Sequence, residues 1–173
     1  MTDGRIPRSR LQDPLGKRYW PLYPGRDPVR TPMQWDASAN AGFGPADPWL
    51  PVKENYRTTR VSSQMQDPDS LLNWYRSLIR LRAEEPALHS GDYRRLSMKE
   101  EVFCFERRWG GDRILVALNF SGKERKVSLP ETGSWKPLLR EGLRSDRKLV
   151  EPQLTDRTTL SKYGVLIAKN SPD

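Results

Sequence analysis

The stretch DPDSLLNWYRSLIRLRAEEPALHSGDY, from Asp67 to Tyr93, separates two kinds of sequence within this chain of 173 residues. Its first part predicts a helix over 67–85, with Asp67 as the N-cap, Pro68 at the first helical position and Pro86 as the stop. A wide apolar stripe, typical of a helix that packs against a sheet, is formed by Leu71, Leu72, Trp74, Tyr75, Leu78, Ile79 and Leu81.

After this stretch the hydrophobic period changes to two. Strands are predicted at 101–109, 112–120 and 124–130, with the turn signals GGD and FSGKE between them. Weaker strands are predicted near 135–139, 148–150, 157–160 and 164–168. We therefore expect an antiparallel β-sandwich in the C-terminal half of the chain.

Before this stretch, residues 1–66 are rich in proline and glycine and show no sustained period. Proline fixes φ and removes a hydrogen-bond donor, so long helices and central strands are not expected there. The many Trp and Tyr residues argue against disorder. We interpret this region as an ordered, irregular layer that lies on another surface.

Composition excludes several classes of protein. The net charge of +8 comes from scattered Lys and Arg interleaved with acidic residues, so no nucleic-acid partner is predicted. No run reaches the roughly 20 apolar residues of a membrane helix, and the first residues lack the apolar stretch of a secretory signal. We expect a cytoplasmic protein. Its single cysteine, Cys104, is expected to be a buried, inert thiol.

The stretch GRDPVRTPMQWDASANAGFG, from Gly25 to Gly44, contains the candidate binding residues. Arg26 and Arg30 flank Asp27, and a guanidinium offers a rigid fork of donors for a carboxylate or for vicinal hydroxyls. The alternative is an ion-pair cluster that pins a surface loop, and the residues alone favour it slightly.

The sequence contains three further features for which a functional and a structural role can be compared. In TPMQWD, Trp35 could stack on a ligand, or Met33 and Trp35 could anchor the loop while Asp36 caps a turn; the structural alternative is favoured. His89, the only histidine, is expected in a turn rather than in a catalytic triad. The glycosylation sequon that begins at Asn119 is discounted.

These motifs, together with PWLPVKENY and the stretch from Val61 to Tyr93, resemble the C-terminal third of an α-glucosidase of glycoside hydrolase family 13, the α-amylase superfamily. The group includes oligo-1,6-glucosidases and trehalose synthases. The resemblance implies an α+β fragment: the last loop and helix of a (β/α)8 barrel, followed by an antiparallel β-sandwich domain. Residues 1–88 would be the remnant of the catalytic barrel, and residues 89–173 the C-terminal β domain.

The family hydrolyses glycosides with retention, using carboxyl groups about 5–5.5 Å apart. All three of its catalytic carboxylates precede the segment that matches here, so the resemblance assigns no catalytic residue to this chain and predicts that it is inactive alone. It does imply a substrate-binding arginine, with Arg30 as first choice and Arg26 as alternative, paired with an aspartate from an early barrel loop. Pro28, where members often have glycine, is one departure.

The residues and the resemblance together lead to three hypotheses for the function of this chain. The first is the C-terminal portion of an α-glucosidase acting on short α-glucosides, with the complementary N-terminal part of the enzyme as its partner and with no cofactor or metal. The second is a standalone carbohydrate-binding or subunit-interaction module, with Trp35, Trp49 and Trp135 as stacking candidates. Nucleic-acid binding ranks last because of the scattered charge.

Overall fold

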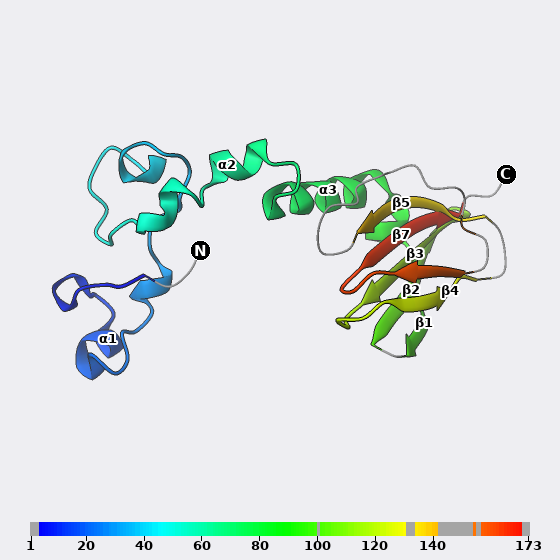
Figure 1. Ribbon diagram of the computed structural model, residues 1–173, viewed down its shortest axis with the longest axis horizontal. Coiled ribbons are helices and arrows are strands. Elements are labelled where there is room, and N and C mark those ends of the chain that lie inside the picture. Colours follow the sequence, from blue (N-terminus) through cyan, green and yellow to red (C-terminus); the bar gives the residue numbers. More distant parts are fainter. Residues whose placement is uncertain (1–3, 100, 131–133, 142–153, 155–156, 171–173) are drawn as a thin grey trace. The chain divides into compact units, whose positions relative to one another are not determined.

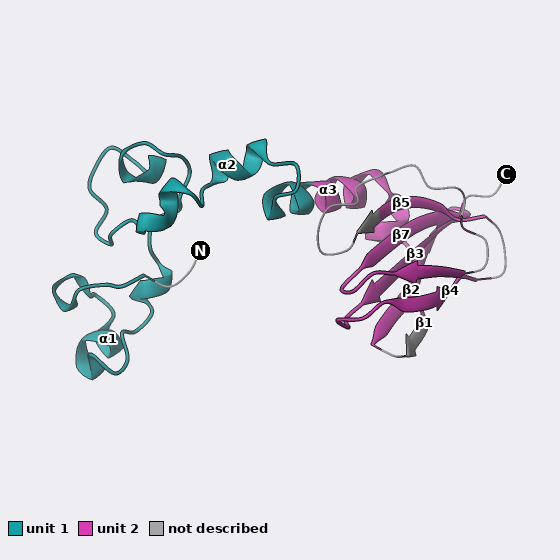
Figure 2. Ribbon diagram, in the orientation of Figure 1, with its two compact units in different colours: residues 1–76 teal, residues 77–173 magenta. Residues whose placement is uncertain are grey.

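The computed structural model describes residues 4–99, 101–130, 134–141, 154 and 157–170. The chain divides into two compact units, residues 1–76 and residues 77–173 (Figure 2). This division falls inside one helix, α3 (Leu71–Glu84). The predicted boundary between residues 88 and 89 is of another kind, because it divides the part that resembles the catalytic barrel from the part that resembles the β domain. That boundary stays a prediction.

The first unit is built from short helices joined by turns. They are η1 (Arg8–Arg10), α1 (Pro14–Tyr19), η2 (Asp27–Val29), η3 (Ala39–Gly42), η4 (Glu54–Arg57) and α2 (Val61–Gln66). No helix within the described residues 4–66 is longer than six residues, and no strand occurs there. This confirms the expectation from the proline content.

The first unit buries few apolar side chains. Its core cluster among the described residues consists of Ile6, Leu11 and Leu50. Seven aromatic side chains among its described residues are each at least 38% exposed: Tyr19, Trp20, Tyr23, Trp35, Phe43, Trp49 and Tyr75. Exposed apolar surface on this scale usually marks an interaction site. The unit therefore matches the expected irregular layer, and the surface that covers it stays a prediction.

Helix α3 begins at Leu71, three residues after Pro68, the predicted first helical position. The carboxylate of Asp67 accepts a hydrogen bond from the Asp69 N–H at 2.8 Å, which closes a turn instead of a helix. The hydroxyl of Ser70 accepts from the Asn73 N–H at 3.2 Å, three residues on, as an N-cap does. The assignment of Asp67 as the N-cap was therefore wrong. Both residues suit an N-cap, and only the backbone geometry distinguishes them.

The second unit contains two antiparallel sheets (Figure 1). The larger has the order β1-β2-β3-β7-β5, and the smaller pairs β4 with β6. The strands are β1 (Asp92–Lys99), β2 (Val102–Trp109), β3 (Asp112–Asn119), β4 (Arg125–Ser128), β5 (Lys136–Glu141), β6 (Arg157–Leu160) and β7 (Val165–Asn170). Strand β1 was not predicted, and the strand predicted at 148–150 lies outside the described residues.

A two-residue turn joins β2 to β3. Trp109 pairs with Asp112, and Gly110 and Gly111 between them have φ angles of 55° and 94°. Two consecutive positive φ values are the geometry of a type I′ hairpin turn, which glycine adopts without steric cost. The GGD signal therefore predicted this connection correctly.

Both faces of the larger sheet contribute to a core. On one face, side chains such as Cys104, Leu115 and Leu166 pack with Val127 and Leu160 of the smaller sheet. This confirms the sandwich.

On the other face, Ile114, Val116 and Ile167 pack with Ala87 of helix α4 (Pro86–Ser90) and with Leu78 and Leu81 of α3. Leu78 therefore faces the sheet, whereas Leu71, Tyr75 and Ile79 are 58–66% exposed. Part of the stripe is thus half-buried against the sheet and part is exposed.

Candidate functional site

The candidate site is the loop around η2, and it is organised by a buried carboxylate. Asp27 is fully buried, and its Oδ2 accepts hydrogen bonds from the backbone N–H groups of Gln12 at 2.7 Å and Asp13 at 2.9 Å. Its Oδ1 is buried without a hydrogen-bond partner among the described residues. The nearest cation is Arg30, whose Nη1 lies 3.9 Å from Oδ1.

Arg30 makes the looser contact of the two candidate arginines. Its side chain is 47% exposed, against 64% for Arg26, but its contact with Asp27 is longer than a hydrogen bond. A guanidinium in this position keeps N–H donors for an external acceptor, while the carboxylate below it partly compensates its charge. The arrangement can therefore bind the oxygen atoms of a polar, uncharged ligand.

Arg26 forms a hydrogen-bonded ion pair within the protein. Its Nε donates to Oδ2 of Asp13 at 2.9 Å, and Oδ1 of Asp13 accepts from the backbone N–H groups of Leu15 and Gly16, at the start of α1. The side-chain hydrogen bond from Arg26 is the main reason that the pKa of Asp13 falls from 3.8 to about 2. The same pair raises the pKa of Arg26. This is the ion-pair alternative of the sequence analysis, realised at one arginine.

The TPMQWD segment has mixed roles. Gln34 is buried, with its side-chain amide 2.8 Å from the side chain of Asn55, so it holds two loop segments together. Asp36 accepts from the Ser38 N–H at 2.8 Å, which confirms the expected turn cap. The hydrogen bond from the Ser38 hydroxyl, followed by the one from its backbone N–H, lowers the pKa of Asp36. Trp35 is 48% exposed and therefore does not anchor the loop to a core.

The other stacking candidates differ from each other. Trp49 is 47% exposed, but Trp135 is fully buried in the core of the β-sandwich, which excludes it from ligand stacking. The alternation around Trp135 could not reveal this, because an aromatic residue in a strand suits either face of a sheet.

Three residues outside the loop behave as the sequence indicated. His89 is exposed in the last turn of helix α4 rather than in a loop turn, and its Nδ1 lies 2.7 Å from the Ser90 hydroxyl, outside any catalytic triad of the described residues. Asn119 is 4% exposed, and its amide nitrogen donates to the backbone oxygens of Lys123 and Ser161, so it is not an accessible glycosylation site. Burial, and then the nearby Glu106, raise the pKa of the Cys104 thiol to about 11, as expected for an inert cysteine.

The described ranges contain neither a metal-binding cluster nor a membrane-spanning helix. No group of three or more His, Cys, Asp or Glu side chains is placed to hold a metal ion. None of the helices there combines the length and the apolar character needed to cross a bilayer.

One group of residues was missed by the sequence analysis. Arg10, Asp47 and Tyr56 line a common cavity, although 46 positions separate the first from the last. No local pattern signals such a convergence, because the irregular loops between them carry no period from which proximity could be read.

Known proteins share both the sequence and the fold of this chain. A family model described as "Alpha amylase, catalytic domain" matches residues 1–91. A probable α-glucosidase of Rhizobium meliloti is 32% identical over 130 residues, which cover 75% of this chain and 24% of that protein. An oligo-1,6-glucosidase of Parageobacillus thermoglucosidasius is 39% identical over 111 residues, which cover 63% of this chain and 20% of that protein.

Solved structures agree with the sequence matches. A crystal structure of an α-glucosyl transfer enzyme superposes on 98% of this chain and 31% of its own, with a TM-score of 0.72 and 32% identity. The trehalulose synthase of Pseudomonas mesoacidophila gives a TM-score of 0.73 at 28% identity, over 98% of this chain and 33% of its own.

The chain thus spans 20–24% of the length of these curated relatives. The catalytic-domain model alone accounts for more than half of its 173 residues. The chain therefore belongs to the α-amylase family of glycoside hydrolases, glycoside hydrolase family 13.

Proposed function

We propose that this chain is the C-terminal portion of a retaining α-glucosidase that acts on short α-glucosides such as maltose or isomaltose. The observation that carries the proposal is the position of Arg30, half-exposed above the buried Asp27, in a segment that matches the family's catalytic domain. The names of its relatives, which include oligo-1,6-glucosidases and a probable α-glucosidase, support the same substrate class.

In this proposal Arg30 binds the substrate. Its guanidinium donates hydrogen bonds to hydroxyl groups of the glucose unit, and an aspartate from an early barrel loop pairs with it. Arg26 is the weaker alternative, because Asp13 already accepts from its Nε. Asp27 orients Arg30 through their 3.9 Å contact and fixes the loop through two backbone hydrogen bonds.

No carboxylate of this chain is assigned a catalytic role. The chain alone is proposed to be inactive, with the complementary N-terminal part of the enzyme as its partner and the cytoplasm as its location. A missing nucleophile and acid cannot be replaced by binding interactions alone.

A chimeric enzyme tests the proposal. The chain would replace the matching C-terminal segment of the Parageobacillus thermoglucosidasius oligo-1,6-glucosidase, and kcat/KM would be measured on a nitrophenyl α-glucoside. We expect the chimera to be active and Arg30→Ala to lower kcat/KM roughly 10²- to 10³-fold, as for other donors that stabilise a transition state. Arg26→Ala should cost less, and Arg8→Ala, at an exposed arginine outside the loop, should cost nothing.

Two outcomes would contradict the proposal. One is release of glucose from maltose by the purified 173-residue chain alone. The other is an active chimera in which Arg30→Ala has no more effect than Arg8→Ala.

The alternative function is a standalone carbohydrate-binding or subunit-interaction module. It is favoured by the exposed rings of Trp35 and Trp49, which are both large and accessible. A chimera without activity, combined with maltose binding that is lost in Trp35→Ala or Trp49→Ala, would support this alternative.

A further inference from the structure

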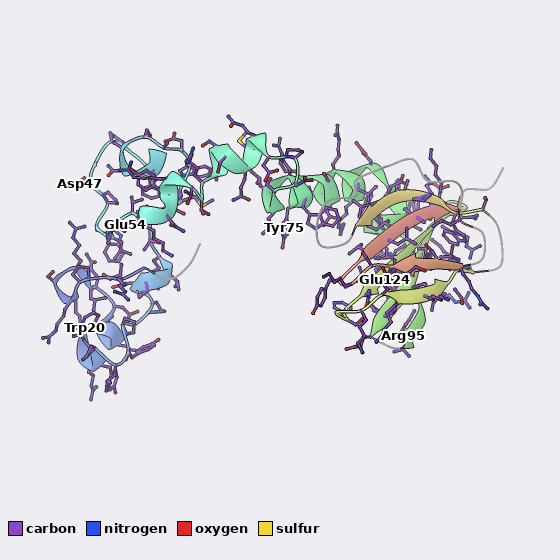
Figure 3. All side chains as sticks on the ribbon, viewed as in Figure 1. Trp20, Asp47, Glu54, Tyr75, Arg95 and Glu124 are labelled. Carbon is purple, nitrogen blue, oxygen red and sulfur yellow. The ribbon has the colours of Figure 1, made fainter. Side chains whose placement is uncertain are left out.

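A cavity of about 280 Å³ lies in the first unit where three stretches of chain meet. Arg10 of η1 and Asn40 and Ala41 of η3 form part of its wall, and the segment that contains Asp47 and Tyr56 forms the rest. Figure 3 labels Asp47 on the connection between η3 and η4. The volume is close to the lower limit of ligand pockets, roughly 300 Å³, and suits one small ring rather than a long chain.

The charged groups of this cavity have no partner in the described part of the protein. The guanidinium of Arg10 and the carboxylate of Asp47 are both exposed, and neither makes an ion pair or a side-chain hydrogen bond there. A guanidinium only donates hydrogen bonds, and an ionised carboxylate only accepts them. Their charges cancel, so the cavity suits a neutral ligand whose hydroxyl groups both donate and accept.

The remaining wall is partly apolar. Tyr56 is half-buried and lines the cavity together with Pro48. A tyrosine ring offers an apolar face and a polar tip, which matches a ligand with C–H groups on its faces and hydroxyl groups on its rim. A pyranose ring has this distribution of groups.

The backbone at the cavity is held in an unfavourable conformation. Asn40 and Ala41 have φ angles of 54° and 55°, in the left-handed region that residues other than glycine rarely adopt. The Ala41 carbonyl accepts from the N–H groups of Trp35 and Asp36, at 2.8 and 3.2 Å, which locks the turn. Backbone strain of this kind concentrates at ligand sites.

The strained turn also supports the segment that leads to Asp47. The side-chain nitrogen of Asn40 donates to the carbonyl oxygens of Gly44 at 3.2 Å and Ala46 at 3.1 Å. Ala46 directly precedes Asp47. Asn40 is therefore a positioning residue, which acts on the cavity through the loop it supports.

We propose that this cavity binds one neutral hexose unit, with Arg10 donating to its hydroxyl groups, Asp47 accepting from them, and the ring of Tyr56 against the sugar face. The choice of a sugar, rather than another neutral polyhydroxyl compound, rests on the proposed function. The position of the site rests on the cavity, its unpaired charges and its strained wall.

Amide NMR spectra of the full 173-residue chain, titrated with methyl α-glucopyranoside and with maltose, test the proposal. We expect saturable shifts at the amides of Ala41, Asp47 and Tyr56, with a Kd of roughly millimolar order. Asp47→Asn should weaken sugar binding at least about fivefold, because it replaces charge-assisted hydrogen bonds from the sugar hydroxyl groups by neutral ones, which are about half as strong. Glu54→Gln is the matched control, because Glu54 is an exposed carboxylate of the same segment that does not line the cavity.

Asn40→Gly separates positioning from contact. Glycine keeps the left-handed backbone but removes the amide group, so the Asp47 amide should shift even without sugar, and the Kd should rise. Two results would overturn the proposal: no saturable shift in the wild-type chain, or sugar binding by Asp47→Asn as tight as by Glu54→Gln. Neither result depends on the chimera, whose activity tests the proposed function separately.

Discussion

Substitutions in α3 test whether this helix is part of the core of the second unit, residues 77–173, which is called the β unit below. Leu78 and Leu81 pack against the cluster of Ile114, Val116 and Ile167, whereas Ile79 is 66% exposed. Truncating a fully buried leucine to alanine costs about 2–5 kcal/mol. Leu78 is only partly buried, and half of that range is a reasonable expectation for Leu78→Ala, about 1–2.5 kcal/mol.

The measurement is thermal and urea unfolding of the full chain, followed by circular dichroism of the sheet. For a unit of roughly 100 residues, each kcal/mol lowers Tm by about 4–8 °C, so Leu78→Ala should lower the Tm of the β unit by roughly 4–20 °C. Ile79→Ala removes a side chain of the same size from the next position and should change stability by less than about 0.5 kcal/mol.

The same reasoning extends to the limits of the β unit. The segment 77–173, which keeps the second half of α3 and all of α4, should be more stable than the segment 90–173, which exposes the Ile114 face of the sheet. Equal unfolding midpoints for these two segments, or equal effects of Leu78→Ala and Ile79→Ala, would refute the assignment of α3 as part of this core. They would then favour the boundary predicted between residues 88 and 89.

Three further outcomes are expected. The pKa of Asp13 is lowered to about 2 by Arg26, so its contribution to stability is present above the ordinary value of 3.8 and is lost as the pH falls from about 4 to 2; Asp13→Asn should remove that dependence in acid titrations of unfolding. Cys104, with its pKa raised to about 11, should not react with an aromatic disulfide reagent at pH 8 until urea unfolds the β unit. Gly42 has a φ of 68°, and a Cβ there would lie 2.6 Å from the Asp36 carboxylate, so Gly42→Ala should destabilise the first unit by about 2 kcal/mol or more, as measured by urea unfolding.

Periodic parts of this sequence were predictable, and their ends were not. The apolar stripe of α3 and the GGD turn each combine a period with a specific local signal, and both were identified. The start of α3 was misplaced because Asp67 and Ser70 are both good caps, and the choice depends on a turn that the Asp67 side chain itself closes.

Strand β1 was missed for a related reason. Its sequence, DYRRLSMK, contains three charged residues among its first four positions and occupies the edge of the sheet. Edge strands are commonly charged, since charge discourages pairing with other chains. The feature that suits the strand to its place therefore removes the alternation by which strands are recognised.

The site was only partly predictable, because sequence spacing does not show which of the two arginines forms a hydrogen-bonded ion pair within the protein. Arg26 and Arg30 are equivalent as sequence, and either could contact a sugar. The structure separates them through Asp13, which lies at the start of α1 and had no predicted role.

The two carboxylates of this loop show why one arginine is structural and the other is available. Asp13 accepts hydrogen bonds with both carboxylate oxygens, from Arg26 and from the backbone N–H groups at the start of α1. Both oxygens are therefore satisfied by groups of the protein itself. Asp27 has one oxygen satisfied by backbone N–H groups and one that faces Arg30 at 3.9 Å. A buried carboxylate is destabilising unless a positive charge compensates it, so Asp27 attracts the guanidinium of Arg30. Because their contact is longer than a hydrogen bond, the N–H donors of Arg30 stay available to a ligand. Because the pair is close to neutral, it suits ligand hydroxyl groups better than anions, which is the property that the proposed binding of a glucose unit requires.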